Sequence, residues 1–169
     1  MTSYRFRFEP LSAAHDRTLF HCGEEVLDRY FQTQATQDIR RRVANCFVAI
    51  EAAAGAIAAY YTLSAASIPV VDLAPEETKR LPRYPALPAV RIGRLAVDQR
   101  FQGRGLGAAL LMNAAHRALQ ADAAAFTLLV DAKNDSAAAF YRHYGFRTLL
   151  SQPRTLFLPL ATAEKIFRL

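Results

Sequence analysis

The most informative segment of the chain reads Val97-Asp98-Gln99-Arg100-Phe101-Gln102-Gly103-Arg104-Gly105-Leu106-Gly107-Ala108-Ala109-Leu110-Leu111. An apolar strand runs into a loop with glycines at alternate positions, and the loop opens directly onto an amphipathic helix. Glycine lets backbone N–H groups turn toward one point without a Cβ in the way, and a helix N-terminus adds donors with partial positive charge. The pattern indicates a cradle for a diphosphate. A glycine-rich turn that only begins a helix is the alternative.

The glycine spacing excludes two other phosphate loops. The segment has no Gly-Lys-Ser/Thr ending of the kind that binds a nucleoside triphosphate. Gly103, Gly105 and Gly107 also do not fit the Gly-x-Gly-x-x-Gly spacing of dinucleotide sites.

Length and hydropathy predict one globular domain over residues 1–169. The chain has 169 residues and is 52% hydrophobic, which is enough for one sizeable core and too short for two ordinary domains. No apolar run approaches the roughly 18 to 20 residues that span a bilayer, and Met1 to Phe8 lacks the apolar stretch of a secretory signal. We therefore expect a cytoplasmic protein with no membrane partner.

The charge of the chain favours an anionic partner. The formal net charge is +6, and the basic residues are almost all arginine, whose planar guanidinium forks onto phosphate oxygens. An arginine-rich surface without any partner is the alternative. Cys22 and Cys46 are too few for a disulfide scaffold, so both are expected as free thiols. The four histidines lack paired ligand spacing, so no metal site is expected.

Hydrophobic periodicity predicts alternating helices and strands. In the first half, we expect strands at Tyr4 to Phe8, Cys46 to Ile50 and Ala56 to Leu63. A helix begins at Glu24, with a buried stripe of Val26, Leu27, Tyr30, Phe31 and Ala35, and ends in the basic cluster of residues 40–42.

The second half continues this mixed pattern. Pro69 to Pro88 contains five prolines and is expected as a loop with one short helical turn around residues 76–80. The remaining elements are strands at 89–97, 126–130, 146–150 and 155–158, and helices at 105–119, 135–143 and 161–167. Gly145 is expected to end the second of these helices.

Two segments resemble the GNAT acetyltransferase superfamily. Gln102-x-x-Gly105-x-Gly107 is similar to the family's Gln/Arg-x-x-Gly-x-Gly/Ala signature, and it follows an apolar strand as in that family. The segment from Asn134 to Phe146 resembles the family's second cofactor-contacting motif. The resemblance implies an α+β GNAT fold: a twisted, mostly antiparallel sheet of six to seven strands, a splayed parallel pair that binds acetyl-CoA, and about four flanking helices.

The resemblance also implies a cofactor site for acetyl-CoA. Backbone amides would bind the pyrophosphate, at Gln102, Gly103, Arg104, Gly105, Leu106 and Gly107. Backbone groups would pair with the pantetheine arm, at Leu95, Ala96 and Val97. Asn134 would face the cofactor, and Tyr141 would direct its hydroxyl at the sulfur.

Tyr141 is the candidate catalytic residue. A phenol can donate a proton at neutral pH with little tuning, so Tyr141 is suited to protonate the departing thiolate as a general acid. The alternative is that Tyr141 only packs in the core, as Tyr144 and Phe146 could.

A longer resemblance is to the acetyltransferase toxins of type II toxin-antitoxin modules. It rests on blocks across most of the chain, at residues 20–23, 60–64, 81–85, 93–98 and 129–132. It implies acetylation of the α-amino group of an aminoacyl-tRNA, inhibition of translation, and neutralisation by a ribbon-helix-helix DNA-binding antitoxin. Such relatives are commonly dimers, so a homodimer is expected.

The acceptor side of the expected site is basic. The strand at 89–97 contains no Asp or Glu, and an α-amino group, which titrates near about 8, needs no strong enzymic base. Four arginines on or beside the proline-rich loop are tentative tRNA contacts: Arg80, Arg83, Arg91 and Arg94. Residues 40–42 form a second basic cluster. The alternatives are solvated surface charges, or a structural bond in the case of Arg94.

Two other functions remain open at this point. One is a GNAT enzyme that acetylates a small-molecule amine or a protein amino group, although a polyamine or aminoglycoside site would need acidic residues to hold a cation. The other is a binding module that keeps acetyl-CoA without turnover. Neither cysteine lies in a nucleophile arrangement, so direct attack of the amine on the thioester is favoured over an acetyl-enzyme.

Overall fold

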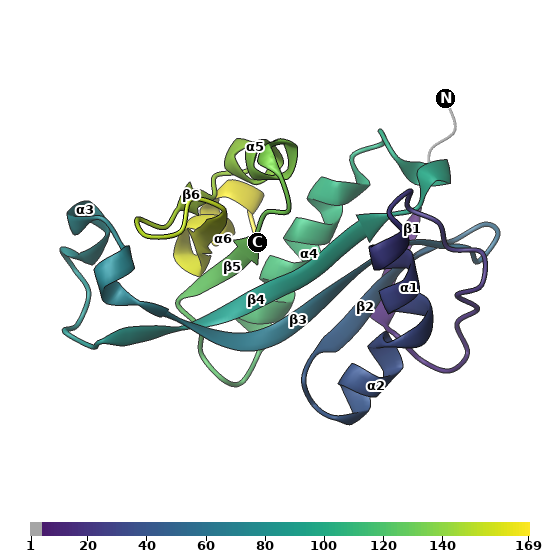
Figure 1. Cartoon of the computed structure of the whole chain (residues 1–169), viewed down its shortest axis with the longest axis horizontal. Coiled ribbons are helices and arrows are strands. Elements are labelled where there is room, and N and C mark those ends of the chain that lie inside the picture. Colours follow the sequence, from purple (N-terminus) through teal and green to yellow (C-terminus); the bar gives the residue numbers. More distant parts are fainter. Residues whose placement is uncertain (1–4) are drawn as a thin grey trace. The chain divides into compact units, whose positions relative to one another are not determined.

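The computed structural model describes residues 5–169, so Tyr4, the expected start of the first strand, lies outside them. The chain forms a mixed α/β fold (Figure 1). The strands are β1 Phe6–Pro10, β2 Asn45–Glu51, β3 Ile57–Pro69, β4 Ala86–Val97, β5 Thr127–Asp131, β6 Arg147–Thr148 and β7 Thr155–Pro159. The α-helices are α1 Glu25–Thr33, α2 Ala35–Arg40, α3 Pro75–Thr78, α4 Leu106–Gln120, α5 Asp135–His143 and α6 Leu160–Phe167. Short 3-10 turns lie at η1 Val70–Asp72 and η2 Gln99–Phe101.

The sheet is mostly antiparallel, as expected. Its hydrogen-bonded order is β1-β2-β3-β4-β5-β7-β6. β4 and β5 are parallel, with a register from Ala89↔Thr127 to Ile92↔Val130, and β4 continues beyond this register to Val97. The seven strands and the parallel pair confirm the expected fold class.

The chain divides into two compact units. The first contains residues up to Ser64 together with Gly93–Asn113, and the second contains Ala65–Ile92 and Ala114–Leu169. β3, β4 and α4 each contribute residues to both.

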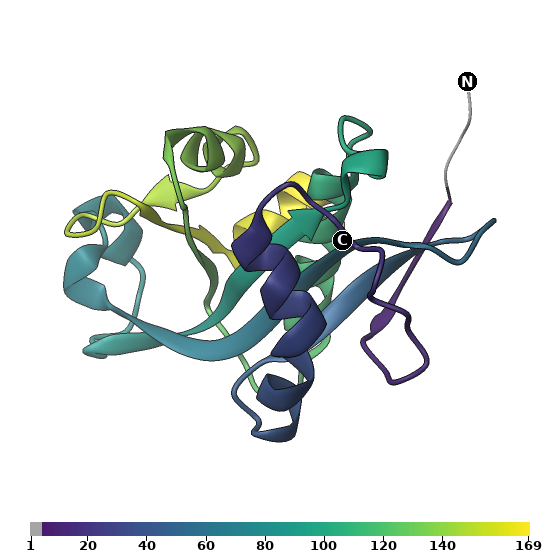
Figure 2. The same cartoon turned by 45° about the vertical axis from the view of Figure 1, so that its right-hand side comes forward.

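An aromatic cluster forms the core of the first unit. α1 packs on β2 and β3 (Figure 2), and the Phe31 and Tyr60 rings stack with centroids 4.3 Å apart. Phe20 meets both rings edge-on. Offset and edge-to-face ring contacts of this kind add to the stabilisation from burial, so they fix α1 against the sheet.

Two buried strands dominate the core of the second unit. Leu128, Leu129 and Val130 of β5 are all at most 1% exposed, which confirms the expectation of a strand buried on both faces. Leu129 packs with Phe157 of β7 in a cluster that also contains Leu87. Asn134 is the N-cap of α5, and its side-chain oxygen accepts a hydrogen bond from Ala137 N at 2.8 Å.

The predicted buried stripe of α1 was wrong at one position. Val26 is 77% exposed, whereas Asp28 is buried. Asp28 takes the inner position because its carboxylate accepts a backbone hydrogen bond from Cys22 N at 2.8 Å. The helix also ends earlier than expected, at Thr33, and α2 begins at Ala35. This break, together with the short α3, gives six α-helices in residues 5–169 where about four were expected.

The predicted loop at Pro69 to Pro88 was too long. β3 extends to Pro69 and β4 begins at Ala86, so Pro88 lies within a strand. Pro88 lacks an N–H, but its carbonyl accepts a hydrogen bond from Phe126 N at 2.8 Å. Proline is tolerated there because the missing donor is not needed for that pairing. Over residues 5–169, no helix is long and apolar enough to cross a bilayer.

Candidate functional site

The glycine loop lies between the end of β4 and the start of α4, as the sequence predicts. Gly103 and Gly105 have φ angles of +75° and +78°, in the region that favours glycine. A Cβ built at either position would meet no atom within 4 Å, so open space surrounds both residues. Directly after them, the first turn of α4 presents backbone N–H groups without intrahelical acceptors. The arrangement suits a diphosphate, because it combines an open approach with convergent donors.

Asp98 anchors the entry to this loop. Its carboxylate is 1% exposed, and accepts hydrogen bonds from Arg100 N, Arg100 Nε and His21 N at 2.9 to 3.0 Å. Burial alone would raise the pKa of Asp98, but hydrogen bonds from Arg100 and His21 outweigh it and hold the pKa below its usual range. Arg100 is therefore committed to Asp98 and is not placed as a free phosphate ligand.

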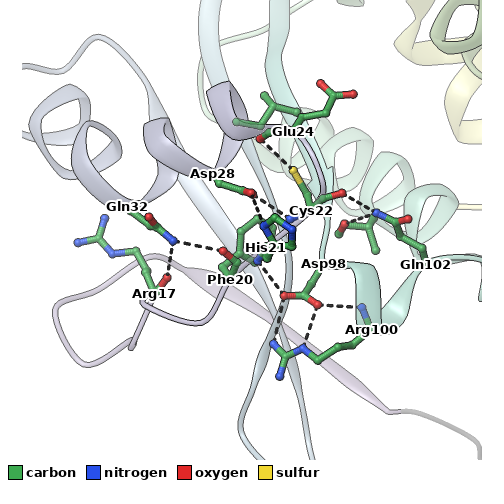
Figure 3. Close-up of polar contacts among 12 residues, drawn as sticks. Arg17, Phe20, His21, Cys22, Glu24, Asp28, Gln32, Asp98, Arg100 and Gln102 are labelled. Carbon is green, nitrogen blue, oxygen red and sulfur yellow. Dashed lines mark hydrogen bonds and ion pairs between the residues drawn. The ribbon is translucent and has the colours of Figure 1, made fainter.

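The Gln102 side chain bonds to the end of β4 and to a backbone segment 80 residues earlier in the chain (Figure 3). Its Nε2 donates to Val97 O and to Cys22 O, both at 2.9 Å. Both N–H donors of the amide are thereby used. Gln102 can therefore contribute to a phosphate site through its backbone amide, as the sequence predicts, and not through its side-chain N–H groups.

Thr62 marks an irregularity in the pairing of β3 with β4. Arg94 N donates to Thr62 Oγ1 at 3.0 Å, and a Cβ on Gly93 would lie 2.9 Å from the same oxygen. Two backbone hydrogen bonds bracket this pairing: Asp98 N donates to Ala58 O, and Val70 N donates to Pro85 O. From one bond to the other, the β3 side spans 12 residues and the β4 side spans 13. The β4 side therefore has one extra residue, as in a β-bulge. Leu95, Ala96 and Val97 follow this point, and the Val97 carbonyl is taken by Gln102.

Tyr141 is almost buried on α5. It is 9% exposed and packs edge-on against Phe140 and Phe146. Within residues 5–169, the Tyr141 hydroxyl has no hydrogen-bond partner. Every fully buried side-chain oxygen in these residues does have a partner. The Tyr141 hydroxyl is therefore not fully buried, and solvent or a ligand can reach it. Burial raises the pKa of Tyr141 to about 12. The ring therefore packs in a core while the hydroxyl stays accessible and protonated, and the catalytic role of Tyr141 stays a prediction.

Asn134 has a structural role. Its side-chain oxygen caps the N-terminus of α5 by accepting from Ala137 N, and its backbone carbonyl accepts from Ala138 N at 3.0 Å, which leaves the side-chain N–H groups for any ligand.

The four arginines proposed as tRNA contacts differ in their surroundings. Arg91 forms an ion pair with Asp131, and the guanidinium of Arg94 lies over the Tyr30 ring at 3.6 Å from its centre. A structural bond for Arg94, one of the alternatives from the sequence, is therefore present. Arg80 and Arg83 are exposed.

The expected site residues fall into both compact units. The first holds Arg94 and the run from Leu95 to Gly107, and the second holds Tyr141, Asn134 and the other three arginines. Sequence reasoning missed the polar network around Asp28 and Thr62, because a buried carboxylate and hydroxyl carry no periodic signal. The resemblance blocks at residues 20–23 and 60–64 were the available hints. No group of three or more metal-ligating side chains occurs in the described part of the chain.

A mostly antiparallel sheet with one parallel pair, in which the first strand of the pair runs through an open glycine loop into a helix N-terminus, is typical of the acetyl-CoA-dependent N-acetyltransferases. The profile of the Acetyltransferase (GNAT) family matches residues 13–146, so the chain belongs to this family. It is accordingly an N-acetyltransferase, and its acetyl donor is acetyl-CoA.

The chain is also similar to individual members of the family and to solved structures. The chain is 35% identical over 158 residues to a tRNA-acetylating toxin of Mycobacterium tuberculosis (strain ATCC 25618 / H37Rv), covering 92% of this chain and 93% of the relative. Its fold is similar to AtaT complexed with acetyl-methionyl-tRNAfMet, with a TM-score of 0.86, 28% identity, and coverage of 96% and 99%. It is also similar to a tyrosine-to-phenylalanine mutant of AtaT bound to the C-terminus of the antitoxin AtaR and acetyl-CoA, with a TM-score of 0.80, 26% identity, and coverage of 97% and 99%.

Proposed function

We propose that the chain is a toxin that acetylates the α-amino group of an aminoacyl-tRNA and thereby inhibits translation. The observation that carries the proposal is the 35% identity to a tRNA-acetylating toxin over nearly the whole of both chains. The fold similarity to AtaT complexed with an acetylated methionyl-tRNA supports the same substrate class. The net charge of +6 suits a polyanionic substrate.

The proposal includes a protein partner. A relative of similar fold binds the C-terminus of its antitoxin, and we infer a corresponding antitoxin for this chain, of the ribbon-helix-helix type. We further propose that residues 1–169 act as one GNAT domain, that the protein is a homodimer, and that it works in the cytoplasm, where charged tRNA is found.

In the proposed mechanism, loop amides bind the cofactor. Residues 102–107 hold the pyrophosphate, and the backbone of Leu95 to Val97 pairs with the pantetheine arm. The acceptor's neutral amine attacks the thioester carbonyl, so a C–N bond forms as the C–S bond breaks. Tyr141 donates its phenolic proton to the leaving thiolate, and the proton that the amine loses passes to water and restores the phenol. The accessible hydroxyl of Tyr141 supports this role, and its raised pKa means that the phenol carries its proton at neutral pH.

The acceptor amine needs little help to lose its proton. An α-amino group titrates near about 8, and esterification to tRNA lowers this value, so a sizeable neutral fraction exists at neutral pH. Of the four arginines, Arg80 and Arg83 are the best placed to meet tRNA phosphates, because both are exposed. Arg91 already pairs with Asp131, and Arg94 already lies over the Tyr30 ring, so neither guanidinium is as available to tRNA as those of Arg80 and Arg83.

Transfer of labelled acetyl groups tests the proposed substrate. The purified chain is incubated with radiolabelled acetyl-CoA and either charged tRNA or the same tRNA after deacylation. We expect label on charged tRNA alone, released with the amino acid on mild base treatment, because the acetyl group would be on the esterified residue. Label on polyamines or protein amino groups, with none on charged tRNA, would instead identify a GNAT enzyme of another substrate class.

A further inference from the structure

The glycines of the loop have no side chains that could hold the loop in one conformation. Gly103 and Gly105 carry no side chains, stand in open space, and have positive φ angles, which glycine adopts about as readily as negative ones, so neither residue selects this conformation by itself. Ordering such a segment on binding costs affinity, so a loop that is already held binds more tightly. The Gln102 side chain holds the start of this loop, with both N–H donors on the carbonyls of Val97 and Cys22.

The Cys22 carbonyl belongs to a turn that is itself fixed on several sides (Figure 3). In this N-terminal turn, residues 20–23, the His21 backbone donates to Asp98 Oδ2 at 3.0 Å and accepts from Gln99 N at 2.9 Å. Cys22 N donates to Asp28 Oδ1 at 2.8 Å, and the other Asp28 oxygen lies 3.0 Å from His21 Nδ1. Two carboxylates that are less than a tenth exposed therefore fix the turn from α1 and from the end of β4.

Gly23 closes the turn against the same loop. Its φ of +100° lies in the left-handed region, and a Cβ there would lie 2.7 Å from Gln99 Nε2. The end of the Gln99 side chain can move aside, but the backbone strain would remain. A side chain at position 23 would therefore disturb the turn that Gln102 uses as its anchor.

We propose that the N-terminal turn positions the glycine loop for the cofactor, and that Gln102 is the positioning residue that connects the turn to the loop. The inference rests on the proposed binding of pyrophosphate by residues 102–107. In this arrangement the Gln102 side chain touches no phosphate. It holds the amides of the following residues in the conformation that receives one, so it acts only on ligands that carry the pyrophosphate.

Binding of two ligands by matched variants separates this role from general destabilisation. Dissociation constants are measured by calorimetry for CoA and for pantetheine, which lacks the pyrophosphate, with melting temperatures recorded alongside. Gln102→Met removes the donors at similar size, Gln102→Arg keeps N–H donors, and Gly23→Ala alters the turn without touching the loop sequence. We expect Gln102→Met and Gly23→Ala to weaken CoA binding about tenfold and to leave pantetheine binding unchanged, and Gln102→Arg to recover most of the loss.

Ligand binding by the wild-type protein tests the pyrophosphate loop separately from the positioning role of Gln102. If it binds CoA no more tightly than pantetheine, the pyrophosphate loop itself is wrong, and the positioning role falls with it. If wild type prefers CoA strongly, but Gln102→Met binds CoA as well as wild type does, or loses both ligands equally, the loop assignment stands and only the positioning role is overturned. Should Gly23→Ala fail to fold, the two Gln102 variants decide the matter.

Discussion

The guanidinium of Arg94 lies 3.6 Å from the centre of the Tyr30 ring, which joins β4 to α1. The Tyr30 hydroxyl in turn donates to Asp38 Oδ2 at 2.7 Å. Burial and the bond to Asp38 raise the pKa of Tyr30, so the ring stays neutral and its face keeps its attraction for the cation. Arg94 is therefore first of all part of the structure, whatever it contributes to substrate binding.

This contact predicts a measurable coupling energy. In a double-mutant cycle of Arg94→Met and Tyr30→Leu, we expect a coupling of about 0.5 to 1 kcal/mol in the free energy of unfolding, from urea denaturation. The change to methionine keeps the stem but removes the charge. Strictly additive effects of the two substitutions would contradict a stabilising cation–π contact.

Removing the Tyr141 hydroxyl should abolish transfer but not binding. For Tyr141→Phe we expect kcat to fall by about 10²- to 10⁴-fold, the usual contribution of a general acid, while the affinity for acetyl-CoA is nearly unchanged. The matched control is Tyr144→Phe, on the same helix, which should transfer acetyl groups at the wild-type rate. Unchanged turnover in Tyr141→Phe would remove this residue from the mechanism.

The pH profile offers a second test of Tyr141. Because burial raises the pKa of Tyr141 to about 12, the phenol remains protonated throughout the neutral and mildly alkaline range. We expect kcat to show no loss attributable to this acid between pH 7 and pH 10, a range well below that value. A fall in kcat within this range that disappears in Tyr141→Phe would contradict the raised pKa.

Charge reversal at an exposed arginine should weaken tRNA binding alone. We expect Arg83→Glu to lower the affinity for tRNA and to reduce the slope of log K against log salt by about 1, with acetyl-CoA affinity intact. Arg83 is a better site for this test than Arg91, because Glu at position 91 would also repel Asp131 and so disturb the fold. Arg168→Glu, the same charge change near the C-terminus, is the control. Equal losses in both variants would indicate a net-charge effect and no defined contact.

Alkaline stability should depend on the two buried thiols. Burial raises the pKa of Cys22 to about 11 and of Cys46 to about 12, from an ordinary value of 9.0. Above that ordinary value the unfolded thiols ionise first, so the unfolded state binds fewer protons and stability falls as pH rises. We expect the unfolding free energy of the wild type to decline from about pH 9, and that of a Cys22→Ala, Cys46→Ala variant to start declining about one unit higher, where tyrosines titrate. Identical pH dependence in both proteins would contradict this.

The regular elements were predictable because their signals are local. The apolar run at Leu128 to Val130 predicts a doubly buried strand, and Gly145, with a φ of +97°, ends α5 where expected. Errors arose where long-range contacts outweigh local preference. Pro88 reads as a strand breaker, but its carbonyl is used by Phe126, and Val26 fits a helical stripe that Asp28 occupies instead.

The fold class, the glycine loop and the place of the candidate acid on its helix were predictable from short runs of neighbouring residues. The hydrogen-bond partners of the polar side chains, in contrast, depend on contacts between segments far apart in the chain. The amide of Gln102 meets the Cys22 carbonyl across 80 positions of sequence, and Asp98 meets the His21 backbone across 77. Such pairs form because a buried donor or acceptor must find a partner wherever the folded chain brings one, and no local pattern records that choice.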